Sequence, residues 1–170
     1  DVVLLSARNL STFYVIDYAT SEILWSCGQH GTFGRREPPE EPLFSYQHEV
    51  DMLPNGNVIM FDNGNERVPQ VSRALEISVD PVAGTVEEVW SWTEPNDIMF
   101  DVFMGDATRL PNGNTLLTDV MQGRLIEVTP DGEKVWQLEM NYGYGPVWIY
   151  KCERVEPWPS CLDSDTDGYG

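Results

Sequence analysis

Two side chains in this sequence have the chemistry needed for covalent group transfer, His48 and Arg8. Imidazole can act as a nucleophile as well as an acid or base, so a covalent intermediate on His48 is chemically reasonable. Arginine binds an oxyanion through paired, planar hydrogen bonds, and Arg8 lies in a polar loop where packing does not require it. The alternative is a histidine hydrogen-bonded where strands cross. Four polar neighbours are candidate substrate-binding residues: Asn9, Gln47, Asp62 and Asn63.

A repeated hairpin sets the position of the histidine. Leu-Pro-Asn-Gly-Asn occurs at 53–57 and again at 110–114, each time between runs of alternating apolar residues. Asn-Gly between such runs favours a two-residue type I′ turn, which needs positive φ at both central residues. His48 precedes the first hairpin, and Asp106 holds the corresponding place before the second. We expect the repeat to supply the scaffold and the chemistry to lie where the two copies differ.

The rest of the chain repeats as well. Three units consist of a strand, a short turn and a second strand ending in Trp25, Trp90 or Trp136. Short strands in repeats of this size are typical of propeller blades, and no window shows a sustained 3.6-residue period. The sequence therefore predicts an all-β partial β-propeller of about three four-stranded antiparallel blades over residues 1–157. We expect the repeated tryptophans to pack between blades, and further blades to precede residue 1.

The acidic end of the sequence, residues 158–170, forms a separate tail in this interpretation. Asp163, Asp165 and Asp167 alternate with other residues and are followed by Gly168, which is the first half of a calcium loop. Such loops supply hard oxygen ligands at alternate positions and need glycine at the turn. Calcium is thus the expected ligand of the tail, and the alternative is a disordered acidic linker.

Cysteines and charge indicate the environment. Cys152 and Cys161 bracket a short loop rich in proline and tryptophan, which suits a disulfide formed in an oxidising compartment. The chain has 28 acidic and 10 basic residues, a net charge of −18. Nucleic-acid binding is disfavoured, because phosphate contacts need a basic surface. No apolar run in the sequence is long enough to span a bilayer.

Several linked motifs occur in a fixed order along the chain: 6–11, 15–17, 23–28, 47–48, 61–64, 72–77 and 86–90. Together they resemble the bacterial arylsulfate sulfotransferase family over roughly residues 1–155. The family's nucleophile lies in a Gln-His pair, which matches Gln47 and His48. Its sulfate-binding arginine lies in a Ser-x-Arg motif, which matches Ser6 and Arg8. A further family histidine, in a His-x-Asn segment, is expected before residue 1.

The resemblance implies a six-bladed propeller enzyme that is periplasmic or secreted and independent of PAPS. Such an enzyme transfers a sulfuryl group from a phenolic sulfate ester to a phenol through a sulfohistidine. Its partners would be small phenolic sulfate donors and phenol acceptors, and catalysis would need no cofactor. The leading alternative is a non-catalytic secreted propeller that keeps only the fold and binds sugars or partners. A quinone-dependent dehydrogenase and a structural surface protein are also open.

Overall fold

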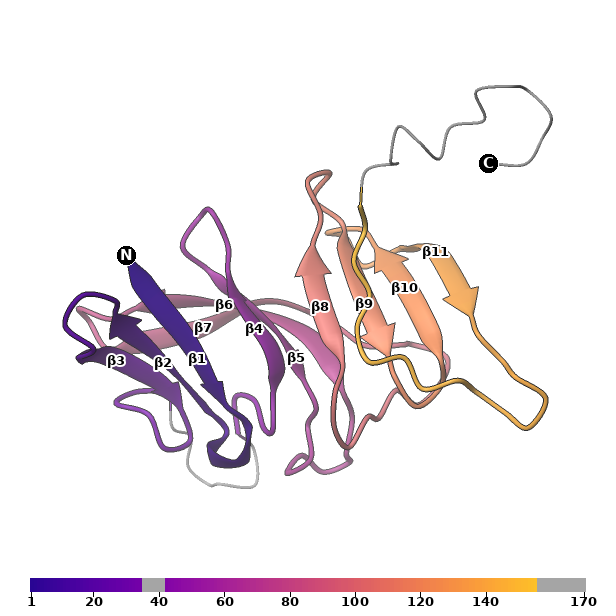
Figure 1. Cartoon of the computed structure of the whole chain (residues 1–170), viewed down its shortest axis with the longest axis horizontal. Helices are drawn as coiled ribbons and strands as arrows, with labels where there is room; N and C mark the ends of the chain where they lie inside the picture. The colour runs from indigo at the N-terminus through magenta and orange to yellow at the C-terminus, as the bar shows by residue number, and fades with distance from the viewer. Residues whose placement is uncertain (35–41, 156–170) are drawn as a thin grey trace.

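The computed structural model describes residues 1–34 and 42–155, which form three antiparallel sheets lying side by side (Figure 1). The first sheet has the order β1-β2-β3, the second β4-β5-β6-β7 and the third β11-β10-β9-β8. This arrangement confirms the prediction of an all-β partial propeller. No helix in the described ranges is long and apolar enough to cross a membrane. The elements are β1 (Val2–Ala7), η1 (Arg8–Leu10), β2 (Thr12–Asp17), β3 (Ile23–Gly28), β4 (His48–Met52), β5 (Val58–Asp62), β6 (Arg73–Asp80), β7 (Thr85–Trp92), β8 (Asp106–Arg109), β9 (Thr115–Asp119), β10 (Arg124–Val128) and β11 (Lys134–Glu139).

The first sheet departs from the four-stranded prediction, since it has three strands within the described residues. β1 pairs with β2 as β5 pairs with β6 and β9 with β10. Val2 therefore already lies in a strand equivalent to β5, the second strand of its blade. As a result, Arg8 and Asn63 hold equivalent places, each directly after the second strand of a blade.

The two repeated hairpins share one loop geometry, which differs from the expected type I′ turn. The Leu53 carbonyl accepts a hydrogen bond from the Gly56 N–H at 2.9 Å, and the Leu53 N–H donates to the Asn57 carbonyl at 2.8 Å. Gly56 has φ of 87° and Gly113 φ of 89°, whereas neither preceding asparagine has positive φ. The loop is a type I turn closed by a glycine in the left-handed region. Proline at the first central position, where φ near −65° is needed, selects this turn.

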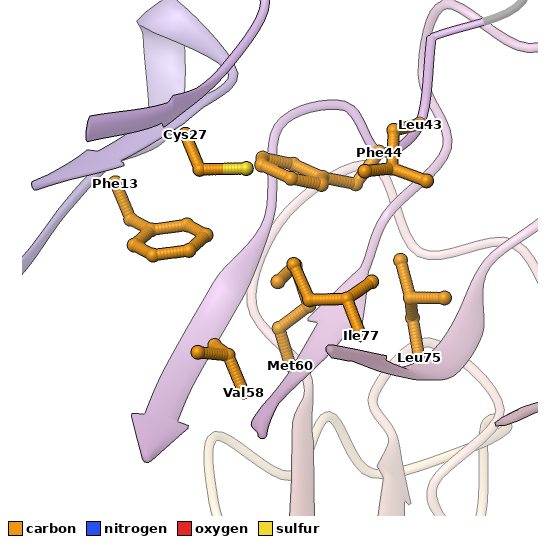
Figure 2. Close-up of a cluster of buried hydrophobic side chains, with 8 residues drawn as sticks. All are labelled: Phe13, Cys27, Leu43, Phe44, Val58, Met60, Leu75 and Ile77. Carbon is orange, nitrogen blue, oxygen red and sulfur yellow. The ribbon is translucent and has the colours of Figure 1, made fainter. Parts of the chain in front are cut away.

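Apolar side chains fill the space between neighbouring sheets. Figure 2 shows the cluster between the first and second sheets, where Phe13 and Cys27 face Val58 and Met60. Burial raises the pKa of the Cys27 thiol to about 12, as expected of a packed cysteine. A second cluster joins the second and third sheets: Phe61, Ala74, Trp92, Met99, Ala107, Leu117, Ile126 and Val128.

The repeated tryptophans have unequal surroundings. Trp90 donates its Nε1–H to the Pro130 carbonyl of the next sheet at 2.9 Å, as expected of a residue between blades. Trp25 packs against the first cluster, with its ring 5.8 Å from that of Phe13. Trp136, on β11 of the third sheet, is 46% exposed, and the described residues contain no further sheet for it to pack against. Packing between sheets therefore occurs at two of the three predicted positions.

Candidate active site

His48 begins β4 and is held by hydrogen bonds at both ring nitrogens. The Met104 N–H donates to Nε2 at 3.1 Å, and Nδ1 lies 2.7 Å from the Asn63 Oδ1. The Asn63 amide donates to the carbonyls of Asp101 and Met104 at 2.9 and 2.8 Å, so its oxygen is left to accept. Both ends of the ring thus assign the same tautomer: Nδ1 carries the proton and Nε2 carries the lone pair.

The electrostatic surroundings keep this imidazole neutral. Burial lowers the pKa of His48, while the hydrogen bond to Asn63 acts in the opposite direction. The positive charge of Arg8 lowers the pKa of His48 further, and the negative charge of Glu49 raises it. The net shift is downward from 6.5, so the ring is neutral at pH 7 and Nε2 is a potential nucleophile.

The backbone around His48 is irregular. Between His48 and Asp51 the register with β5 shifts, because β4 carries one extra residue in a β-bulge. Tyr46 and Glu49, on either side of the Gln-His pair, have positive φ of 57° and 44°. Such conformations are unfavourable for residues other than glycine and persist where the surrounding structure enforces them. The extra residue changes the face of the sheet to which the side chains that follow His48 point.

Arg8 reaches the same place from the first sheet. Its Nη2 donates to the Val102 carbonyl at 2.5 Å and its Nη1 to the Asn9 Oδ1 at 2.9 Å. The guanidinium carbon lies 4.7 Å above the centre of the Tyr46 ring, a cation–π contact. Arg8, His48 and Asn63 therefore each hydrogen-bond to one loop, Asp101 to Gly105, and Asn9 joins them only through Arg8.

Gln47 lies elsewhere than expected of a residue that contacts substrate. It is fully buried, and its amide donates to the Ser6 Oγ at 3.0 Å and the Thr12 carbonyl at 3.1 Å. These bonds tie the second sheet to the first, directly beneath His48. Its Oε1 has no hydrogen-bond partner among the described residues. The geometry gives Gln47 a positioning role between sheets.

Asp62 is also fully buried, at the end of β5. Its carboxylate forms ion pairs with Arg67 and with the Nε of Arg73, the latter at 3.0 Å. It also accepts hydrogen bonds from the backbone N–H groups of Ser45 and Gly64 at 2.9 and 3.0 Å. With its oxygens so occupied, Asp62 holds the loops around the site rather than facing it.

The sequence did not predict that residues 101–105 belong to the site. This loop contacts the site through backbone N–H and carbonyl groups, which do not depend on residue type. Its first residue fixes it to the third sheet, since the Asp101 carboxylate accepts hydrogen bonds from the N–H groups of Val120 and Met121 at 3.0 and 2.8 Å. Burial raises the pKa of Asp101 to about 6, and these two N–H groups act against that rise.

The predicted calcium ligands Asp163, Asp165 and Asp167 lie outside the described residues, as does Cys161. Cys152 has no disulfide partner among residues 1–34 and 42–155, and its sulfur accepts a hydrogen bond from the Thr118 hydroxyl at 3.1 Å; its pairing with Cys161 stays a prediction. Within residues 1–34 and 42–155, no group of three or more His, Cys, Asp or Glu residues could hold a metal ion.

The sequence motifs and this geometry agree with a comparison against protein families. The family model described as arylsulfotransferase (ASST) matches residues 1–143, which include His48, Arg8 and the 101–105 loop. The chain belongs to the arylsulfotransferase family.

Among solved structures, the chain is similar to a virginiamycin B lyase from Staphylococcus aureus, with 16% identity and a TM-score of 0.48. It is similar, at 18% identity and a TM-score of 0.48, to a protein of unknown function from Bacteroides caccae. The matches cover 82% and 84% of this chain but only 38% and 42% of those proteins. A comparison with curated protein sequences finds no significant match.

Proposed function

We propose that this protein transfers a sulfuryl group from a phenolic sulfate ester to a phenol through a covalent intermediate on His48. The observation that carries the proposal is the tautomer of His48, since a neutral ring with its lone pair on Nε2 is the form that can attack sulfur. Arg8 beside it supplies a planar cation suited to the sulfuryl oxygens.

In the first half-reaction, Nε2 attacks the sulfur atom in line with the ester oxygen. The nitrogen–sulfur bond forms as the sulfur–oxygen bond breaks, and the phenolate leaves with the bonding electron pair. Arg8 offsets the negative charge of the sulfuryl oxygens. The ring becomes cationic, and the Asn63 Oδ1 accepts the Nδ1 hydrogen bond that stabilises this form.

In the second half-reaction, the oxygen of an acceptor phenol attacks the same sulfur. The nitrogen–sulfur bond breaks, its electron pair returns to Nε2, and His48 regains its starting form. Over the whole cycle one proton passes from the acceptor phenol to the departing phenolate. Because the ester itself supplies the sulfuryl group, the cycle needs no nucleotide cofactor.

Trapping the intermediate tests this proposal. The protein is mixed with 4-nitrophenyl sulfate without acceptor, quenched, digested and analysed by peptide mass spectrometry. We expect a burst of 4-nitrophenolate and one sulfuryl group on the peptide that contains His48. His48→Asn should lose both signals, whereas His30→Asn should keep both, because the His30 side chain is exposed and its hydrogen bond to Thr12 is made by the backbone N–H.

The second candidate is a propeller that binds aryl sulfates without transferring the group. One observation favours it: the Met104 N–H occupies Nε2, the atom that must attack. Saturable binding of 4-nitrophenyl sulfate, with neither a burst nor an adduct on His48, would select this function and refute catalysis.

A further inference from the structure

The 101–105 loop occupies the polar groups that the proposed reaction needs. The Val102 carbonyl accepts the hydrogen bond from Arg8 Nη2, and the Met104 N–H donates to His48 Nε2. The Asn63 amide is bound to the carbonyls of Asp101 and Met104. In this state Arg8 and Nε2 each have a backbone partner where a sulfuryl group would need them.

We propose that the 101–105 loop masks the site in the ligand-free protein and that a sulfate group displaces it. This inference rests on the proposed function, because it assigns His48 and Arg8 to the same anion. A sulfate oxygen would replace the Val102 carbonyl on Arg8, as both are hydrogen-bond acceptors. Sulfur must approach Nε2 along its lone pair, the direction that the Met104 N–H now fills.

The loop is fixed at both ends by contacts outside the site, whereas its middle is held through Arg8, His48, Asn63 and Asn65. At one end, the Asp101 N–H donates to the Ser72 Oγ at 2.8 Å, beside the carboxylate contacts with the third sheet. At the other, Gly105 has φ of 104° and lies so close to Phe61 that an added Cβ would come within 2.3 Å of the ring. Between them, Val102 is 39% exposed. The ends can thus stay in place while the middle moves.

Strain in the middle favours its release. Met104 has φ of 66°, a left-handed conformation that is unfavourable for a residue with a Cβ. The closed state keeps this conformation because Asn63 and His48 bind the two polar groups of Met104. Asn65 adds a further tie, donating from Nδ2 to the Val102 carbonyl at 3.0 Å. When an anion binds Arg8 and Nε2, the middle of the loop keeps only its hydrogen bonds to Asn63 and Asn65. Each of these contributes little net free energy and can be replaced by a hydrogen bond to water.

Loop masking of His48 can be measured without a transfer assay, by comparing the chemical reactivity of His48 with that of His30. Diethyl pyrocarbonate acylates the unprotonated nitrogen of an accessible imidazole, and at pH 7.5 an ordinary histidine is neutral. We expect His48 to react on the order of tenfold more slowly than the exposed His30, because Nε2 is bound. Asn65→Ala removes one tie without touching His48 or Arg8, and should speed the reaction of His48 about threefold while leaving His30 unchanged.

A second pair of variants separates loop opening from backbone strain. Gly105→Ala forces a Cβ against the Phe61 ring and should expose His48 more than Asn65→Ala does. Gly113→Ala is the matched control, since its φ of 89° is equally unfavourable and its Cβ meets no atom closer than 3.8 Å. It should leave the reaction of His48 unchanged.

Displacement by the anion is tested with inorganic sulfate. Because the loop competes with the anion for Arg8, sulfate should bind more tightly, by about two- to fivefold, to Asn65→Ala than to the wild type. Two results would overturn the mask: wild-type His48 reacting as fast as His30, or sulfate affinity unchanged in both loop variants. Neither measurement depends on catalysis, so the mask can fail while the sulfohistidine is trapped, and the reverse.

Discussion

The second and third sheets, β4–β7 and β8–β11, are built on the same internal ties. Asp62 pairs with Arg73 in one, and Asp119 with Arg124 in the other, at equivalent ends of neighbouring strands. A second tie recurs farther along: the Asn57 amide donates to Glu76 at 2.6 Å, and the Asn114 amide donates to Glu127 at 2.7 Å. These carboxylates stabilise each sheet together with the hairpin that begins it.

The two sheets differ at the ends of the same strands. His48 begins β4 and is followed by a bulge before Asp51, whereas Asp106 begins β8 with regular pairing. Asn63 follows β5 and its side chain binds the imidazole, whereas Val120 follows β9 and donates its backbone N–H to Asp101. The buried ion pairs are common to both sheets and hold the scaffold. The residues of the site lie at neighbouring positions that take no part in these pairs and that differ between the two sheets.

The largest effect should come from breaking the shared ion pairs. Asp62→Ala leaves Arg67 and two backbone N–H groups without this acceptor, whereas Arg73 keeps its ion pair with Glu88 at 2.9 Å, so the free energy of unfolding should fall by about 3–5 kcal/mol. Asp119→Ala should cost about 2–3 kcal/mol, because Arg124 keeps an ion pair with Asp97 at 2.9 Å. Chemical denaturation measures both. Equal losses would show that the two ties are equivalent and would contradict the extra role of Asp62.

The equivalent residues His48 and Asp106 should give opposite dependence of stability on pH. Burial raises the pKa of Asp106 to about 6, so its contribution to stability falls as pH rises from about 4 to 6. Asp106→Asn should therefore raise the free energy of unfolding at pH 7 by about 1–2 kcal/mol and have little effect near pH 4. The pKa of His48 is lowered, so its contribution is complete above pH 6.5 and declines below it.

Unfolding curves at several pH values measure these slopes, with His48→Asn as the partner variant. The histidine variant should flatten the loss of stability below pH 6.5. The prediction fails if the wild type becomes more stable as pH rises from 4 to 6 and Asp106→Asn abolishes that rise. A buried carboxyl group with a raised pKa has the opposite effect.

Replacing Arg8 by lysine should change substrate binding and little else. Lysine keeps the positive charge but cannot donate the paired, coplanar hydrogen bonds of a guanidinium group. The KM for an aryl sulfate donor should therefore rise about tenfold. Arg109→Lys is the control from the third sheet, where Arg109 lies 4.9 Å over Trp90 and pairs with Glu76 at 2.6 Å. Initial rates of transfer from 4-nitrophenyl sulfate measure both. A matching rise in KM for the control would attribute the effect to the scaffold.

The smallest effect should be equal in the two hairpins. Gly56→Ala and Gly113→Ala each place a Cβ at φ near 90°, without a close contact, so each should lower the free energy of unfolding by about 1 kcal/mol. Thermal unfolding of the two variants measures the costs. A difference well above a few tenths of a kcal/mol would mean that the two loops are not the same turn.

The composition of short segments was enough to predict the strands, the hairpin positions and the all-β class. Alternating apolar residues and Leu-Pro-Asn-Gly-Asn act over a few residues, so they can be recognised without a structure. The turn type was wrong, although Pro54 was visible, because the prediction weighed Asn-Gly alone. The position of Trp136 was also not predictable, since packing between sheets depends on what lies on each face.

Within the site, residue types and family motifs pointed to His48, Arg8 and Asn63, and the structure gathers these three around one loop. The same reasoning placed Gln47 and Asp62 against the substrate, whereas both are buried in contacts that hold the sheets and loops. A polar residue beside a catalytic motif is equally compatible with either role, and only its partners distinguish them.

The sequence by itself determined the blades, the turn positions and the family, because each is encoded by neighbouring residues or by short motifs in order. Only the tertiary structure decided the state of His48. Its tautomer depends on Met104, 56 residues away, and the partner of Arg8 lies 94 residues away. Such contacts arise when separate blades pack side by side, and backbone N–H and carbonyl groups, which every residue carries, leave no trace of them in the sequence.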